Sequence, residues 1–397
     1  MAWRKVLPMD ERLRFIFEAQ LKLWTITELC KRYGISRKTG YKWINRFDQQ
    51  GLDGMGERSR APKHCPHRTA DQVVKRVVAE RKRHPRWGPK KIAQAIKRAG
   101  TDFSVPAAST IGEILKRHVL VKRRRRRRGA LRRWPKTLTQ PKRANHVWGV
   151  DFKGWFRTGN GLRCDPLTAS DLYSRFVLDC RALKAQTIQL VQPAFDTIFT
   201  DYGLPEVIRV DNGTPFGSTG PCGLTRLSVW WVQLGIRVEF IEPGHPEQNA
   251  VHERMHRTLK DETCCPPKWT HNAQQRRFDQ WRNEFNHERP HEALKMRCPA
   301  EVYQASAIVY DRQPKPFCYP GHFELRRVKK AGQIVLHGVD RFIGRAFRGI
   351  NVGLEPIRSD QFLVHAGPLV IGTISCKTKA PMQPIVSKQV SRSFSMN

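Results

Sequence analysis

Residues 243–260 read PGHPEQNAVHERMHRTLK, a loop containing Pro and Gly followed by a run of helix-forming residues. At about 100° per residue, one face of the expected helix is mainly apolar and is the face that it would bury: Val251, Met255, Thr258 and Leu259. Glu253, Arg257 and Lys260 fall together on the opposite face. A carboxylate beside two cations on an exposed face suits a site that holds a metal ion next to a phosphate backbone. A solvated ion pair between Glu253 and Arg257 would give the same pattern.

Two segments upstream favour the metal site. Residues 148–156 (WGVDFKGWF) read as a strand that contains Asp151, and residues 207–214 (VIRVDNGT) read as a strand that ends in Asp211 at an Asn-Gly turn. Together with Glu253 on the later helix, these aspartates can converge on one edge of a sheet. Three adjacent carboxylates repel one another unless cations lie between them, and hard oxygen ligands select Mg²⁺ or Mn²⁺.

Other acidic residues compete for the third ligand position. Glu247 lies closer to the prolines of the loop, but only Glu253 shares its helix face with Arg257 and Lys260. Three further aspartates lie near expected turns and are weaker candidates: Asp165, Asp171 and Asp201.

In their order and spacing, these segments resemble the DDE catalytic core shared by retroviral integrases and many bacterial transposases. The sequence of these segments is most similar to that of insertion-sequence transposases of the 481 type. The resemblance includes DNGTPFG at 211–217, PEQN at 246–249 and the stretch 282–294, and it extends over about 28–372. It implies a ribonuclease-H-like core, a mixed sheet with helices on both faces.

The resemblance also implies an activity and a cofactor. Asp151 would bridge two Mg²⁺ (or Mn²⁺) ions, Asp211 would hold one and Glu253 the other. Such a transposase binds the terminal inverted repeats of its element, cleaves the DNA at the ends and joins the 3′-OH to target DNA by two-metal phosphoryl transfer. Joining two ends implies a homo-oligomer, a dimer or tetramer, on double-stranded DNA.

Four residues near the carboxylates are predicted DNA contacts: Asn212, His256, Arg257 and Lys260. His256 could alternatively assist proton transfer or be purely structural.

One position departs from the family pattern. Ala250 stands where these proteins usually have Gly before the catalytic helix. If a positive φ is needed there, Ala costs about 1 kcal/mol. A catalytically impaired relic that binds specific DNA is therefore an alternative, and a metal-dependent nuclease that cuts without joining is another.

Composition agrees with a polyanionic partner. The 397 residues carry a formal net charge of +37, and residues 1–150 hold 39 Lys and Arg against 11 Asp and Glu. An asymmetric basic half is typical of proteins that bind nucleic acid. No apolar run is long enough for a membrane span and no signal-peptide pattern is present, so a cytoplasmic, nucleoid-associated bacterial protein is expected.

The N-terminal region reads as two helical DNA-binding domains. In residues 1–50, a second helix capped by Thr27, a Gly turn and a third helix capped by Ser36 have helix-turn-helix spacing. After a linker at 51–68, residues 69–120 read as a second helix-turn-helix-like domain. The candidate DNA contacts in the two domains are Arg37, Lys38, Thr39, Tyr41, Lys42, Lys90, Lys91, Ser109 and Thr110.

The remaining boundaries follow from changes of pattern. Residues 121–144 form an Arg-rich linker, 145–305 the catalytic core with trailing helices, 317–375 a small β-barrel and 376–397 a disordered tail. The linker contains six consecutive arginines that are predicted to lie along DNA phosphates, although a solvated spacer is the alternative: Arg123, Arg124, Arg125, Arg126, Arg127 and Arg128.

Overall fold

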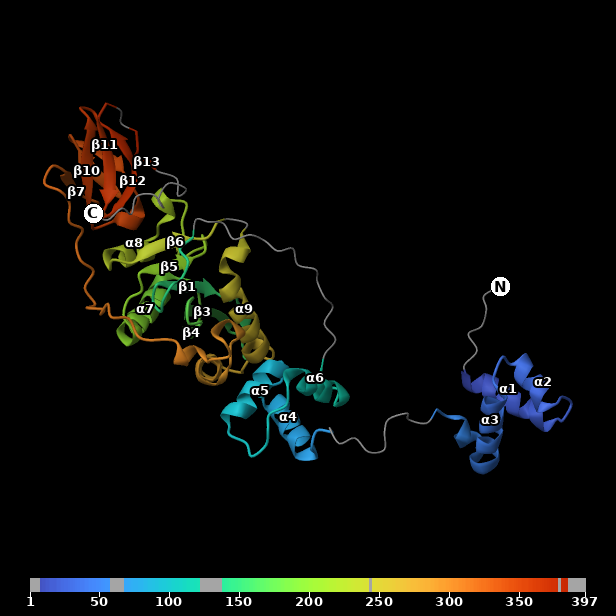
Figure 1. Ribbon diagram of the computed structural model, residues 1–397. Coiled ribbons are helices and arrows are strands. Elements are labelled where there is room, and N and C mark those ends of the chain that lie inside the picture. The colour runs from blue at the N-terminus through green and yellow to red at the C-terminus, as the bar shows by residue number, and fades with distance from the viewer. Residues whose placement is uncertain (1–7, 58–67, 122–137, 243–244, 378–379, 385–397) are drawn as a thin grey trace. The chain divides into compact units, whose positions relative to one another are not determined.

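The computed structural model describes residues 8–57, 68–121, 138–242, 245–377 and 380–384. The chain divides into two compact units, residues 1–69 and 70–397, which are described separately (Figure 1). The predicted DNA contacts at Arg123 to Arg128 lie outside the described residues. Among the described helices, none has the length and apolar character needed to cross a bilayer.

The first unit is helical. Phe15, Leu29 and Trp43, one from each of its long helices, are buried in a common core. Gly40 allows two helices to pack closely, because a Cβ atom at this position would lie 2.5 Å from Cys30 Sγ. The elements are α1 (Pro8–Gln20), α2 (Ile26–Arg32), α3 (Arg37–Gln50) and the short 3₁₀ helix η1 (Gly51–Met55).

Side-chain caps set the helix starts in this unit. The Ser36 hydroxyl accepts a hydrogen bond from the Thr39 N–H, so α3 begins as predicted. For α2 the predicted cap, Thr27, is wrong. Thr25 caps this helix through a reciprocal capping box with Glu28, because the glutamate stands three residues after Thr25 and accepts from its backbone N–H.

The second unit begins with three further helices, which lie within the predicted second domain at 69–120. Trp87, Ile92 and Ile111 belong to their common buried core, and Pro89 stands at the first position of its helix, where its missing N–H costs nothing. The helices are α4 (Asp71–Arg83), α5 (Pro89–Arg98) and α6 (Ala108–Arg117).

A six-stranded mixed sheet forms the centre of this unit. β3 runs antiparallel to β1, β2 and β4, whereas β1 and β5 are parallel, as are β5 and β6. The predicted mixed sheet is therefore confirmed. Its strands are β1 (Val147–Phe152), β2 (Phe156–Arg157), β3 (Arg163–Asp171), β4 (Val177–Leu183), β5 (Val207–Val210) and β6 (Arg237–Phe240).

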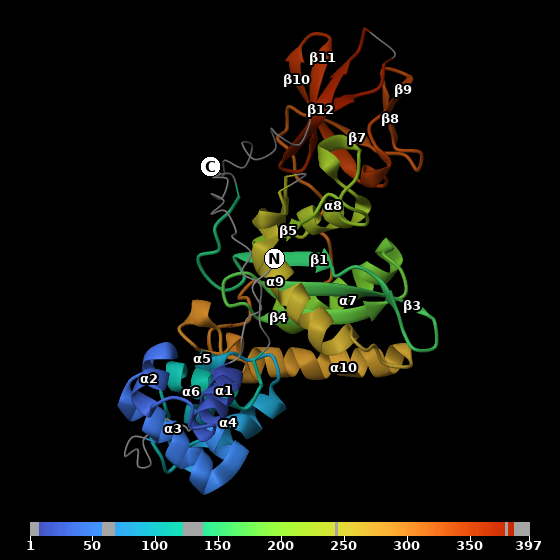
Figure 2. The same ribbon diagram turned by 90° about the vertical axis from the view of Figure 1, so that its right-hand side faces the viewer.

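Side-chain alternation divides the sheet into two faces. Trp148 and Val150 pack with helices α7 (Ile188–Tyr202) and α8 (Arg226–Gln233). The opposite face is covered by α9 (Ala250–Leu259) and α10 (His271–Asn283), whose buried residues pack with β4. Figure 2 shows α9 lying across the sheet beside β1. Asp151 follows Val147 by an even number of residues on β1, so its side chain lies on the same face of the sheet, the face that α9 covers.

The helices after the sheet end in π-helical segments. α9 continues into a π-helical segment, η4 (Lys260–Cys264), and α10 into another, η5 (Glu284–Glu288). Pro290 then ends the helix, and only the 3₁₀ turns η6 (Glu292–Leu294) and η7 (Pro299–Glu301) follow.

The described C-terminal residues form an open antiparallel sheet, and the predicted β-barrel is not confirmed. Its strand order is β13-β12-β11-β10-β7, with β13 and β7 as edges, and a separate hairpin shares its core. The predicted disordered tail is also wrong at its start, because β13 pairs with β12 and Met382 is buried. The strands are β7 (Glu324–Arg327), β8 (Gln333–Leu336), β9 (Val339–Phe342), β10 (Asn351–Arg358), β11 (Gln361–Ala366), β12 (Leu369–Ser375) and β13 (Gln383–Pro384).

Candidate active site

Adjacent parallel strands bring two of the predicted carboxylates level with each other. The register pairs Val147 with Val207 and Gly149 with Arg209. Continuing it by two residues places Asp151 beside Asp211, which directly follows β5. Because side chains alternate, both aspartates leave the same face of the sheet.

Asp151 lies in an environment that disfavours its ionised form. Its side chain is 21% exposed. Burial, and then the neighbouring charges of Asp211 and Glu253, raise its pKa to about 7, against the opposing effect of the Phe152 N–H and Lys153. The three predicted carboxylates are thus electrostatic neighbours.

Asp211 is held at a sharp turn. Burial raises its pKa, and a hydrogen bond from the Gly213 N–H opposes that shift. A Cβ atom at position 213 would lie 3.0 Å from Asp211 Oδ2, so the glycine lets the backbone approach the carboxylate. Glu253 is exposed in the first turn of α9, where a negative charge is favoured by the helix dipole.

The donor set fits a divalent cation. Buried oxygen ligands of like charge disfavour one another's ionised form, and a hard cation between them would remove that penalty. In the part of the chain that is described, no group of three His, Cys, Asp or Glu side chains is arranged closely enough to hold a metal ion. With α9 in its present position, the exposed side chain of Glu253 would need to adopt another rotamer to share an ion with the aspartates. The side chain of Glu247, the alternative third ligand, lies outside the described residues.

Beneath the carboxylates lies a polar layer that the sequence did not reveal. His252 and His256 are buried and both hydrogen-bond to Thr168, while His252 also bonds to Ser170. Burial lowers the pKa of His252 to about 3 and lowers that of His256 well below its usual value. Because His256 is only 5% exposed, its position does not support the predicted DNA contact.

Lys153 is a second residue that sequence reasoning missed. Its charge opposes the pKa rise at Asp151 and lowers the pKa of His256. The available signal was its place two residues after Asp151 in the same segment, which favours the same side of the chain. Arg257, Lys260 and Asn212 are exposed, as their predicted phosphate contacts require.

Ala250 does not need a positive φ. It is the first residue of α9, and it is absent from the described non-glycine residues with positive φ. Asn249 before it has φ −113° and ψ 18°. At position 250, inside the helix, alanine is a better helix former than glycine. The departure from the family pattern therefore gives no reason to expect an impaired site.

Comparison with known families decides the class of the central domain. Residues 141–246 and 234–299 each match a family described as Integrase core domain. The chain contains an integrase core domain. Residues 11–63 match a Helix-turn-helix domain and residues 39–115 a Homeodomain-like domain, so DNA-binding helical domains precede the integrase core.

Similar proteins come from bacterial insertion elements. The "Insertion element IS407 uncharacterized 31.7 kDa protein" of Burkholderia multivorans is 27% identical over 238 residues, which cover 59% of this chain and 82% of that protein. The "Insertion element IS476 uncharacterized 39.2 kDa protein" of Xanthomonas euvesicatoria is 30% identical over 159 residues, covering 40% of this chain and 44% of that protein.

The solved structures that match parts of the chain come from viral integrase and intasome studies, and both TM-scores are below 0.5. The HTLV-2 integrase catalytic core domain in complex with magnesium is 15% identical, covers 42% of this chain and 100% of its own, and has a TM-score of 0.33. A chain in the structure of the simian T-cell lymphotropic virus intasome in complex with PP2A regulatory subunit B56 gamma is 16% identical, and the match covers 71% of this chain and 93% of that chain with a TM-score of 0.37.

Ion pairs join helices α4 and α5 and the turn between them to the integrase core, with every acidic partner on the core: Arg83–Glu288 at 3.2 Å, Arg86–Asp261 at 2.6 Å, Lys90–Glu292 at 3.1 Å and Arg98–Glu301 at 2.8 Å. Lys90 and Glu292 are both more than 60% exposed, so their pair is weak and leaves Lys90 able to exchange onto a phosphate.

Burial, and then Arg289, lower the pKa of Lys91 to about 8, and this placement does not support its predicted DNA contact. Ser109 is exposed and Thr110 half-buried at the start of α6.

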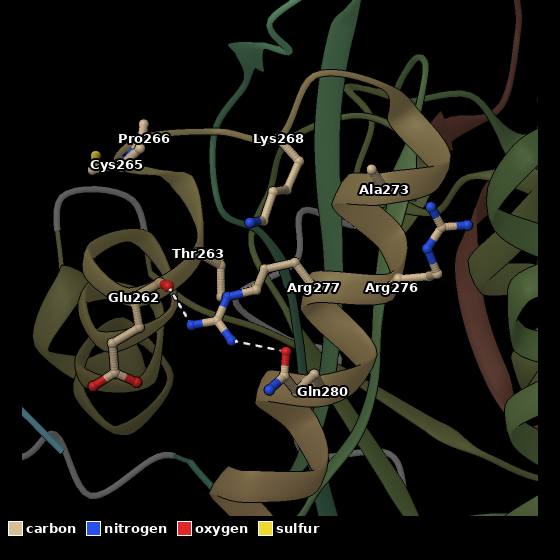
Figure 3. A pocket seen from close by; sticks show the side chains of 9 residues that line it. All are labelled: Glu262, Thr263, Cys265, Pro266, Lys268, Ala273, Arg276, Arg277 and Gln280. Atoms are coloured by element: carbon tan, nitrogen blue, oxygen red, sulfur yellow. Dashed lines mark hydrogen bonds between the residues drawn. The ribbon is translucent and has the colours of Figure 1, made fainter. Parts of the chain in front are cut away.

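One cavity of the second unit is separate from the carboxylates. It measures about 550 Å³ and lies between the end of η4 and α10 (Figure 3). Arg277 donates across it to the Glu262 carbonyl, and it also donates to Gln280 Oε1 on its own helix. None of Asp151, Asp211 and Glu253 lines this cavity, so it is not the candidate active site.

Most of the predicted contacts on α3 lie at its surface. Arg37, Lys38, Tyr41 and Lys42 are exposed, and Thr39 is half-buried. We expect the double variant Arg37→Ala/Lys38→Ala to weaken DNA binding and to reduce the slope of log K against log salt by about 2, because each lost phosphate contact contributes about 0.9. Fluorescence anisotropy across a salt series measures this slope.

The matched control for α3 removes the same charge elsewhere in the first unit. Arg14 and Lys22 are exposed near α1, and Arg14→Ala/Lys22→Ala is expected to leave the slope nearly unchanged. Equal loss in both double variants would mean that binding depends on net charge and not on α3.

Proposed function

We propose that this protein is the transposase of a bacterial insertion sequence, which binds the ends of its element, cleaves there and joins the 3′-OH to target DNA. The observation that carries this proposal is the placement of Asp151 and Asp211 level on parallel strands, with Glu253 on α9 raising the pKa of Asp151. The helix-turn-helix domains and the relatives from insertion elements support it.

In this proposal Asp151, Asp211 and Glu253 are the residues that would hold two Mg²⁺ or Mn²⁺ ions. When bound, the ions would activate the attacking oxygen and stabilise the leaving oxygen of the phosphoryl group. Arg257 and Lys260, exposed on the helix that carries Glu253, hold the phosphates of the DNA beside the carboxylates.

Two neighbouring amides shape the same site. Asn249 Nδ2 lies 3.4 Å from Asp151 Oδ2 and orients that carboxylate. Asn212 Nδ2 donates to the Ile241 carbonyl at 2.6 Å, which fixes the turn after Asp211 to the chain leading towards α9. Two element ends must be joined together, so two or more copies of the chain act on one DNA complex.

A joining assay tests the proposal. The purified full-length protein is incubated with DNA carrying its element's ends, a target plasmid and Mg²⁺, with an EDTA reaction beside it. We expect covalently joined product only where Mg²⁺ is present. Cut but unjoined ends would instead assign a nuclease, and bound but uncut ends a sequence-specific DNA-binding protein.

A further inference from the structure

Four polar side chains form a buried cluster between β3 and α9. Thr168 and His252 are 0% exposed, Ser170 is 4% and His256 is 5% exposed. Thr168 Oγ1 lies 2.7 Å from His252 Nε2, 2.6 Å from His256 Nε2 and 3.0 Å from the Asp151 carbonyl oxygen. One hydroxyl thus contacts the strand of one catalytic carboxylate and the helix of another.

The chemistry of a hydroxyl group assigns the hydrogens. Thr168 has one hydrogen to donate and two lone pairs that accept. The Asp151 carbonyl can only accept, so all three contacts are satisfied together only if Thr168 donates to it. Its lone pairs then accept from the Nε2–H groups of His252 and His256.

This assignment defines the other ring nitrogens. The Nδ1 atom of His252 accepts from the Ser170 hydroxyl at 3.0 Å. The Nδ1 atom of His256 carries a lone pair and lies 3.8 Å from Asp151 Oδ2, so it does not donate to that carboxylate. His256 therefore does not hold Asp151 Oδ2 by a hydrogen bond and leaves that oxygen to a cation and to Asn249 Nδ2.

The cluster also sets how closely α9 approaches the sheet. A Cβ atom on Gly149 would lie 3.1 Å from His252 Nδ1 and 2.8 Å from Leu172 Cδ2, so the glycine makes room for the imidazole. His252 directly precedes Glu253 in the chain, and His256 lies one turn further along the same helix. Thr168 therefore links the strand that carries Asp151 to the helix that carries Glu253.

We propose that Thr168 is a positioning residue whose hydroxyl fixes the spacing between Asp151 on β1 and Glu253 on α9, and with it the geometry in which these carboxylates bind a divalent cation. The inference rests on the proposed function, since it assumes that the carboxylates are metal ligands. Thr168 touches neither metal nor DNA, and it acts through the backbone of Asp151 and the two histidines.

The test measures Mn²⁺ binding to the full-length protein by electron paramagnetic resonance, without DNA and without turnover. Thr168→Val keeps the shape of the side chain and removes the hydroxyl. It is expected to weaken Mn²⁺ binding roughly tenfold or more, as loss of an outer-shell partner does. Thr168→Ser, which keeps the hydroxyl, is expected to restore affinity close to wild type.

A matched control separates positioning from general stability. Thr263 is 2% exposed and donates to the Leu259 carbonyl at 2.7 Å. Thr263→Val removes a buried hydroxyl of the same kind, away from the carboxylates. Thermal unfolding is expected to show that both valine variants fold and are less stable, while only Thr168→Val loses Mn²⁺ affinity.

Two results would overturn the inference in different ways. Wild-type Mn²⁺ affinity in a folded Thr168→Val protein, or the same loss in Thr263→Val, would show that the hydroxyl is merely structural while the proposed function stands. If Asp151→Asn binds Mn²⁺ as tightly as the wild-type protein does, the proposed metal site does not exist and the inference fails with it.

Discussion

Replacing Asp151 with asparagine is expected to lower the rate of DNA joining by roughly a thousandfold or more, because a metal-held phosphoryl group gains several kcal/mol of transition-state stabilisation and each 1.36 kcal/mol is tenfold in rate. Asparagine keeps the size of the side chain but removes the charge that would bridge the ions. The quantity to measure is the single-turnover rate of joined product in saturating Mg²⁺, with DNA affinity measured separately to show that binding is intact.

The same replacement is expected to stabilise the metal-free protein. Burial and Asp211 raise the pKa of Asp151 to about 7, so its ionised form opposes folding. The gain in unfolding free energy is on the order of 1–4 kcal/mol above pH 7, since one pKa unit equals about 1.4 kcal/mol. Below the unfolded-state pKa of about 4, Asp151 is protonated in both states, so its raised pKa does not change the unfolding free energy. The difference in unfolding free energy between variant and wild type therefore grows between about pH 4 and 7. Urea unfolding at both limits measures it.

Variants of the two candidate third ligands complete this prediction. Glu253→Gln is expected to match Asp151→Asn in the joining assay, whereas Glu247→Gln keeps most of the activity. If Glu247→Gln abolishes joining and Glu253→Gln does not, the third ligand has been misassigned. Asp151→Asn protein that still joins DNA at the wild-type rate would contradict the mechanism as a whole.

Replacing Arg289 with alanine is expected to lower the free energy of unfolding by about 3 kcal/mol, the usual result of leaving one partner of a buried ion pair alone. Its guanidinium is 10% exposed and donates two hydrogen bonds to Glu262, at 2.9 and 3.2 Å. Trp281 Nε1 donates to the same carboxylate at 2.8 Å. The pair connects the π-helical extension of α9 to the end of η5, and chemical denaturation measures its loss.

An exposed pair provides the comparison for Arg289. Lys116 and Glu113 are 62% and 56% exposed, and Lys116→Ala is expected to change the unfolding free energy by no more than about 1 kcal/mol. Similar small losses in both variants would show that Arg289 and Glu262 do not hold the two helices together.

The sequence allowed prediction of the features that depend on local pattern. Apolar and aromatic residues around Asp151, and an apolar run that leads to Asp211 at an Asn-Gly turn, are sufficient to place Asp151 on a strand and Asp211 at a strand end. The register that sets them level, and their pKa values, could not be read from the sequence because both depend on which strands pair. Ser36 was identified as a cap because its partner Thr39 is only three residues away.

The buried face of α9 shows where local pattern fails. Val251 and Thr258 were predicted to be buried, but His252 and His256 occupy the interior instead, while Val251 and Thr258 are half-buried. An imidazole can be buried when it finds polar partners. Those partners, including Thr168, lie more than 80 residues away in sequence, so the helix alone gives no sign of them.

Long-range pairing also explains the errors at the C-terminus. Alternating strands and glycine turns predict an antiparallel sheet, but closure into a barrel requires the edge strands to pair, and β7 and β13 do not pair within the described residues. Met382 lies in a polar, Ser-rich stretch that has the composition of a disordered tail. It is nevertheless buried, because β12 offers β13 a free edge.

The most direct test of the central claim is anomalous X-ray diffraction from crystals of the full-length protein bound to end DNA and soaked with Mn²⁺. The account predicts manganese peaks at Asp151, one shared with Asp211 and one shared with Glu253. Absence of manganese between Asp151 and Asp211 in well-ordered crystals, or a peak held by Glu247 in place of Glu253, would contradict it.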